Sequence, residues 1–123
     1  MNTQTPQGIL LVNKAKGKTS FSLVSQLRKI TGIKKIGHSG TLDPFASGVM
    51  AMLIGRNYTK KAPLFLHSEK EYEALIKLGY TTETLDSESP EIPISSAKPN
   101  ISEIKTVLSN HFQGEINQKI PLY

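Results

Sequence analysis

The 123-residue chain contains no cysteine and no tryptophan, and aromatic residues make up only 7% of it. The absence of cysteine excludes disulfides, thiol catalysis and thiolate metal sites. No apolar run approaches the ~18 residues of a membrane span, and the first six residues lack the basic and apolar regions of a secretory signal. These absences predict a cytoplasmic protein with one modest core.

Acidic residues are scarce in the first half of the chain. Residues 1–61 hold ten Lys and Arg but one acidic residue, Asp43, whereas residues 62–123 hold five basic and nine acidic residues. The formal net charge of +5 therefore hides a strongly basic half. Such a half favours a polyanionic partner, most often a nucleic acid. On charge alone, the alternative is a lysine-rich surface that meets only solvent.

The spacing of apolar residues and of helix-breaking residues predicts strands and helices in alternation, which indicates a mixed α/β (α+β) fold. The expected elements of the first half are a buried strand over 8–13, a helix from Thr19 or Ser20 to Gly32, a long loop over 33–48, a buried strand over 49–54 and a short helix over 59–66. The expected elements of the second half are a half-buried strand over 70–78, a surface connection over 81–100, a helix from a Ser102 cap to Gly114 and the start of a strand over 116–123.

Residues 37–48 form the segment with the clearest chemistry. Their glycines let the backbone approach a ligand closely, and Pro44 stiffens the chain directly after Asp43. A lone carboxylate beside His38 and among cations is expected to be ionised, which suits nucleophilic catalysis better than general-acid work. The plainer interpretation is an Asp-Pro turn with a loop histidine. One His and one Asp cannot complete a metal site.

Ordered motifs run through nearly the whole chain. They are Gly8-x-Leu10-Leu11-Val12-x-Lys14-x-x-Gly17-x-Thr19-Ser20, Lys35-x-Gly37-His38-x-Gly40-Thr41-Leu42-Asp43-Pro44-x-Ala46-x-Gly48, Lys70-x-Tyr72, Leu78-Gly79-x-x-Thr82-x-Thr84-x-Asp86 and Phe112-x-Gly114-x-Ile116-x-Gln118. In this order, they resemble the bacterial tRNA pseudouridine synthases of the TruB family. The resemblance implies a largely antiparallel mixed sheet flanked by helices, tRNA as the partner, a monomer, and no cofactor, metal or membrane.

The resemblance also implies an activity, the isomerisation of uridine 55 in the tRNA T-loop to pseudouridine after base flipping. Asp43 matches the catalytic nucleophile, His38 the histidine that helps to open the T-loop, and Tyr72 the tyrosine that packs on the target uracil. Leu42 and Lys14 are also assigned to the substrate side, Lys14 being either structural or phosphate-facing. The candidates for contacts with the RNA backbone are Lys34, Lys35, Arg56 and Lys60.

Several alternatives stay open at this stage. The carboxylate of Asp43 has three routes: attack on the anomeric carbon of the ribose, action as a base at the 2′ position, or addition to the uracil ring. Tyr72 either packs in a core or provides a stacking surface worth ~1–3 kcal/mol per base. A non-catalytic module that binds or folds tRNA is the competing function.

The chain also departs from the family pattern. The family's catalytic domain continues into a Lys-Gly-Thr-Tyr-Ile-Arg stretch that completes the pocket, and most members add a small C-terminal RNA-binding domain; these 123 residues contain neither. Ala15 also stands where a proline is usual. We therefore expect a disordered tail over 1–7 and a truncated, N-terminal portion of the catalytic domain over 8–123, inactive by itself.

Overall fold

The structure, a computed structural model, describes residues 6–117. They belong to two compact units that divide between Tyr72 and Glu73. Each unit combines helical segments with an antiparallel sheet, which confirms the mixed α/β fold.

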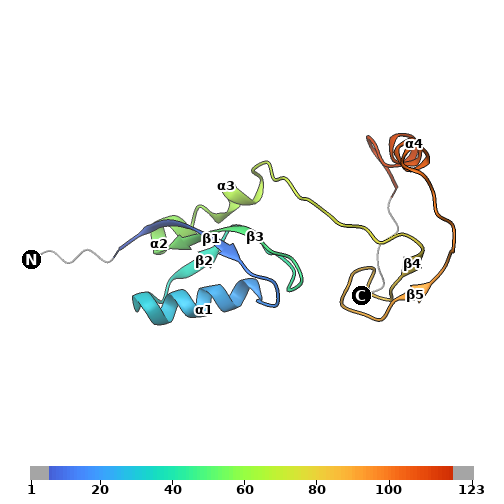
Figure 1. Cartoon of the computed structure of the whole chain (residues 1–123). Helices are drawn as coiled ribbons and strands as arrows, with labels where there is room; N and C mark the ends of the chain where they lie inside the picture. Colours follow the sequence, from blue (N-terminus) through green and yellow to red (C-terminus); the bar gives the residue numbers. More distant parts are fainter. Residues whose placement is uncertain (1–5, 118–123) are drawn as a thin grey trace, which may run out of the picture. The chain divides into compact units, whose positions relative to one another are not determined.

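The first unit is a three-stranded antiparallel sheet with helices (Figure 1). Its elements are β1 (Gly8–Lys14), α1 (Ser20–Thr31), β2 (Ile36–His38), β3 (Gly48–Ile54), α2 (Arg56–Thr59) and α3 (Ala62–Leu66). The strand order is β1-β3-β2, so β3 is central. Lys14 pairs with Gly48 at one end of β3, and Ile36 pairs with Ile54 at the other. These two pairings define the two ends of the sheet.

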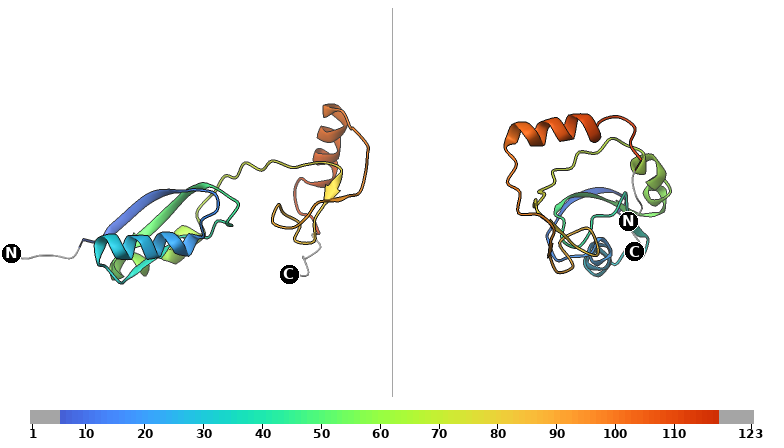
Figure 2. Two further views of the ribbon diagram at one scale, coloured as in Figure 1. Left: turned by 60° about the horizontal axis from the view of Figure 1, so that its bottom comes forward. Right: turned by 90° about the vertical axis from the view of Figure 1, so that its right-hand side faces the viewer.

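Helix α1 begins and ends where the sequence predicts. The side chain of Thr19 accepts a hydrogen bond from the backbone of Ser22, and Gly32 ends the helix in the left-handed conformation, with φ of 71°. The helix lies along one face of the sheet (Figures 1 and 2).

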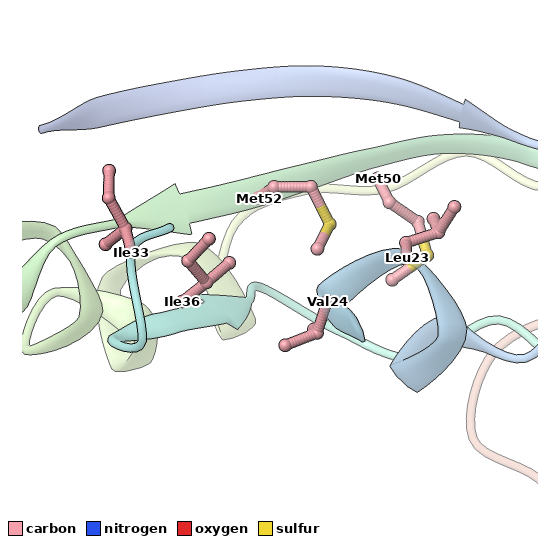
Figure 3. Close-up of a cluster of buried hydrophobic side chains, with 6 residues drawn as sticks. All are labelled: Leu23, Val24, Ile33, Ile36, Met50 and Met52. Atoms are coloured by element: carbon pink, nitrogen blue, oxygen red, sulfur yellow. The ribbon is translucent and has the colours of Figure 1, made fainter. Parts of the chain in front are cut away.

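The core of the first unit lies between α1 and the sheet. Met50 and Met52 lie two positions apart on β3, so both side chains are on the face toward α1, whose Leu23 and Val24 pack toward them (Figure 3). Ile33 and Ile36 extend the cluster where the chain leaves α1 and enters β2. The predicted buried strand over 49–54 is confirmed, because Met52 and Leu53 have no exposed surface.

Three expectations for the first unit need correction. The strand over 8–13 is present but is not buried, because β1 lies at an edge of the sheet and leaves Leu11 68% exposed. The predicted loop over 33–48 contains β2, since Gly37 does not prevent pairing with β3. The single helix expected over 59–66 is instead α2 and α3, the second with a proline in its first turn.

The second unit has little regular structure. It contains β4 (Tyr80–Thr81) paired with β5 (Ile92–Pro93), and α4 (Ile101–His111). Helix α4 starts one residue before Ser102, so the expected cap is wrong: Asn100 caps the helix and forms a capping box with Glu103. Of the strand expected over 116–123, residues 118–123 lie outside the described part, and residues 116 and 117 form no strand.

The predicted strand over 70–78 is wrong. No residue before Tyr80 in this stretch is in a strand, and the side chains of Tyr72, Ile76 and Leu78 are exposed. Alternation creates an apolar face, but a strand also needs a neighbour that accepts and donates its backbone hydrogen bonds. Among residues 6–117, no segment pairs with 70–78.

Candidate active site

The carboxylate of Asp43 is presented by a turn, not by a helix or strand. The amide of Ala46 donates a hydrogen bond of 3.0 Å to the carbonyl oxygen of Asp43, which closes a four-residue turn with Pro44 in its second position. Asp43 itself is exposed. We call residues 39–47 the Asp43 loop; it connects β2 to β3. The Asp-Pro turn is therefore real, and it leaves the carboxylate accessible to a ligand.

Lys14 fixes the chain that follows Asp43. It is the last residue of β1 and has no exposed surface. Its Nζ donates to the carbonyl oxygens of Ala46 at 2.6 Å and Lys18 at 2.7 Å, with longer contacts to those of Ala15 at 3.3 Å and Pro44 at 3.4 Å. Because its donors are used inside the protein, this geometry favours the structural role of Lys14 over contact with a phosphate.

A second lock joins the Asp43 loop to the basic turn after β1. The amide of Gly17 donates to the carbonyl oxygen of Pro44 at 2.8 Å. Gly17 has a φ of 77°, a left-handed conformation that glycine adopts without strain. The turn and the Asp43 loop are thus held together by backbone as well as by Lys14.

Ser20 fixes the chain that precedes Asp43. Its buried hydroxyl donates to the carbonyl oxygen of Leu42 and accepts from the amide of Leu42, both at 3.0 Å. The side chain of Leu42 packs against the core of the first unit. The sequence predicts Ser20 only as an alternative helix cap to Thr19. The signal that could have revealed its second role is a hydroxyl residue directly beside another possible cap, within a family motif.

His38 lies at the end of β2, next to the Asp43 loop. It pairs with Met52 of β3 and is partly buried. Its Nδ1 atom is buried and has no hydrogen-bond partner within the described part of the chain. One ring nitrogen therefore faces the protein without a partner among the described residues. His38 stands five positions before Asp43 in the chain.

 His38 is the last residue of β2, and Asp43 lies in the loop that follows it and leads to β3.

The other sequence-predicted residues make no hydrogen bond to this turn within residues 6–117. Tyr72 is 69% exposed, on the irregular segment after α3; Lys70, two residues before it, approaches the Asp43 loop, because a Cβ placed on Gly40 would lie 4.0 Å from its Cε. Lys34, Lys35, Arg56 and Lys60 are exposed and lie toward the Ile36–Ile54 end of the sheet. The structure therefore brings together Lys14, Leu42 and Asp43, and it places the four basic residues at the other end of the sheet.

Within residues 6–117, no group of three His, Asp or Glu side chains is arranged to hold a metal ion. In the same range, no helix is both long enough and apolar enough to cross a bilayer.

Comparison with known proteins finds one family. Residues 28–123 match the family described as TruB family pseudouridylate synthase (N terminal domain). The chain is 55% identical to "tRNA pseudouridine synthase B" of Protochlamydia amoebophila over 117 residues, which are 95% of the chain and 44% of that protein. The protein of the same name from Chlamydia pneumoniae is 49% identical over 95% of the chain, with 49% of its own length covered. The chain spans about half the length of these relatives, and it belongs to the TruB family of pseudouridylate synthases.

Proposed function

We propose that the chain carries the catalytic aspartate of a tRNA pseudouridine synthase, and that Asp43 is the nucleophile. The observation that carries the proposal is the exposed carboxylate of Asp43 in a loop fixed on both sides, by Ser20 before it and by Lys14 and Gly17 after it. A fixed loop holds the carboxylate in one place without using its oxygens. A nucleophile needs that combination of order and access.

The reaction balances without a cofactor. Uridine and pseudouridine are isomers: the bond from N1 of uracil to C1′ of ribose breaks, and a bond from C5 to C1′ forms. One proton leaves C5, and one is gained at N1. No electrons enter or leave, so a carboxylate and a group that moves a proton are sufficient. All three routes open to Asp43 require its carboxylate to touch the nucleoside.

The finer assignments belong to the same proposal. The substrate is uridine 55 in the T-loop, which is flipped out of the loop because its glycosidic bond is otherwise hidden; flipping costs a few kcal/mol. His38, next to the Asp43 loop, helps to open the T-loop, and Tyr72 stacks on the uracil and assists the loss of the proton from C5. Leu42 lines the substrate side. The relatives' printed name, tRNA pseudouridine synthase B, supports this substrate class.

A chimaera tests the activity. The matching 117 residues of the Protochlamydia amoebophila protein are replaced by those of this chain, and pseudouridine is measured in unmodified tRNA transcripts. We expect the chimaera to form pseudouridine and the 123-residue chain alone to form none. An inactive chimaera beside an active parent protein refutes the proposal.

Asp43→Asn tests the nucleophile within the chimaera. It keeps the shape of an exposed side chain, so folding should be unaffected. We expect the rate to fall by roughly 1000-fold or more, with tRNA affinity within about threefold of the unsubstituted chimaera. The matched control is Glu115→Gln, which neutralises another exposed carboxylate and should change neither quantity. A near-normal rate for Asp43→Asn would show that another group is the nucleophile.

A further inference from the structure

We infer that Lys70 is a positioning residue of the proposed active site, which ties the end of α3 to the Asp43 loop and so fixes where the chain delivers Tyr72 to the uracil. The inference rests on the proposed function, because the part that Tyr72 plays is taken from there. Lys70 itself does not touch the nucleotide; it acts through Tyr72, which follows two residues later.

The ammonium group of Lys70 closes the end of α3. Its Nζ atom donates to the carbonyl oxygens of Leu66 at 2.8 Å, Ser68 at 3.0 Å and Phe65 at 3.2 Å. Phe65 and Leu66 are the last two residues of the helix, and the last carbonyl groups of a helix have no partner inside it. An ammonium group has three N–H donors, so this arrangement uses all of them.

Lys70 makes these bonds although two carboxylates are its neighbours in the chain. Glu69 and Glu71 flank it, yet the only ion pair in the described part of the chain is Lys77–Glu91. The carbonyl groups at a helix end carry partial negative charge, and here they hold the ammonium group in place of a carboxylate. Because its donors are used inside the first unit, Lys70 is not arranged to bind a phosphate.

The aliphatic stem of Lys70 lies against the Asp43 loop. A Cβ placed on Gly40 would lie 4.0 Å from Cε of Lys70, which is an ordinary van der Waals contact. Gly40 belongs to the same loop that Ser20 and Lys14 hold from the other side of the sequence. Lys70 therefore touches both the helix that precedes it and the loop that carries the proposed nucleophile. We call these contacts of Lys70, with the end of α3 and with Gly40, the Lys70 anchor.

The fold brings Lys70 to this loop because the chain turns back after β3. Strand β3 ends away from the Asp43 loop, where Ile54 pairs with Ile36. Helix α2 follows and packs over β2, since the γ-methyl group of Thr59 would lie 3.7 Å from a Cβ placed on Gly37. Because Lys70 then contacts the Asp43 loop, α2 and α3 carry the chain back along the sheet (Figure 1).

Tyr72 follows the Lys70 anchor closely. Two residues span at most about 7 Å, so the backbone of Tyr72 stays within that distance of the backbone of Lys70. The side chain of Tyr72 is 69% exposed, which leaves its ring free to stack on a base. An anchor at this point limits the space that the ring explores. In an active site, a misplacement of ~1 Å can cost about 100-fold in rate.

Nuclear magnetic resonance of the 123-residue chain tests the Lys70 anchor itself. We expect a nuclear Overhauser cross-peak between the ε-methylene protons of Lys70 and the α-protons of Gly40. Lys70→Met keeps the stem but removes the three donors. The amide of Ser68, which donates to the carbonyl oxygen of Phe65 at 3.3 Å, should then exchange at least about threefold faster. The control Lys29→Met, at an exposed position of α1, should leave that rate unchanged. A missing cross-peak or an unchanged rate in Lys70→Met overturns the inference.

The chimaera tests what the anchor does for the reaction. We expect Lys70→Met to lower the single-turnover rate by about 10- to 100-fold, while KM for the tRNA transcript stays within about threefold. Lys29→Met should keep both quantities within about twofold. Both variants should unfold within about 4 °C of the unsubstituted chimaera, because both side chains are exposed. A raised KM with an unchanged rate would make Lys70 an RNA contact and overturn the inference.

A double-substitution cycle separates positioning from general stability. Lys70→Met is combined with Tyr72→Ala, and product is followed over hours so that slow variants stay measurable. If Lys70 acts through Tyr72, then Lys70→Met should slow the Tyr72→Ala chimaera by less than about twofold. Equal effects of Lys70→Met with and without Tyr72 overturn the inference, while the active chimaera still supports the proposed function. An inactive chimaera refutes the proposed function and with it the role of Lys70 in the reaction, whereas exchange of the Ser68 amide decides the anchor by itself.

Discussion

Replacing Lys14 by methionine should loosen the Asp43 loop and destabilise the first unit. Methionine fills nearly the same space but donates no hydrogen bond. The two short bonds, to the carbonyl oxygens of Lys18 and Ala46 at 2.7 and 2.6 Å, are then lost. At about 1.5–3 kcal/mol for each bond that involves a charged group, the gross loss is about 3–6 kcal/mol.

Part of that loss is offset. Burying an ammonium group costs several kcal/mol, and the methionine variant avoids this cost. We therefore expect the free energy of unfolding to fall by about 2–3 kcal/mol, which for a unit of this size lowers Tm by about 10–20 °C. The side chain of Lys16, in the same turn, is exposed, so the control variant Lys16→Met should change stability by less than about 0.5 kcal/mol.

Circular dichroism gives Tm, and amide hydrogen exchange locates the change. The amides of Gly17 and Ala46 report on the loop, because they donate to the carbonyl oxygens of Pro44 and Asp43. Both amides should exchange faster in Lys14→Met, while those in the middle of α1 should keep most of their protection. If Lys14→Met unfolds within a degree of the unsubstituted chain and these two amides keep their rates, the structural role assigned to Lys14 is wrong.

Two predictions concern the second unit. Asn100→Ala removes the capping box of α4 and should cost about 1 kcal/mol of helix stability, seen as lower helicity by circular dichroism, whereas Asn110→Ala, inside the same helix, should not lower it. Hydrogen bonds from the Thr84 hydroxyl, and secondly from the Glu88 amide, hold the pKa of Asp86 below its ordinary value. The stabilisation by this carboxylate is therefore present above the ordinary pKa and is lost as the pH falls through the lowered one. Exchange of the Glu88 amide, corrected for intrinsic rates, should show the loss of protection at acidic pH, and pH-independent protection would contradict the assignment.

Local signals predicted the helices best. A helix cap acts over three or four residues, so Thr19 and Gly32 determine where α1 begins and ends without help from the rest of the fold. The same argument explains the error at α4: Ser102 and Asn100 are both acceptable caps, and the partner Glu103 decides for Asn100.

Strands were predicted less well because they depend on partners. The apolar runs of β1 and β3 look alike in sequence, yet β3 is central and buried while β1 is an edge with exposed side chains. The alternation over 70–78 is stronger than either, and within the described residues it forms no strand. Periodicity shows which face of a strand is apolar, but it does not show whether a neighbouring strand exists.

The candidate site likewise has some features that the sequence predicts and others that only the tertiary structure shows. The sequence by itself determined the family motifs, the isolation of Asp43 among cations and the turn that Pro44 favours, because these depend on residues that are adjacent in the chain. Only the tertiary structure decided that Ser20 and Lys14 hold the two sides of the Asp43 loop, and that Arg28, Lys35 and Arg56 gather at the other end of the sheet. Such contacts join residues up to 32 positions apart, and strand pairing, not local pattern, brings them within hydrogen-bonding distance.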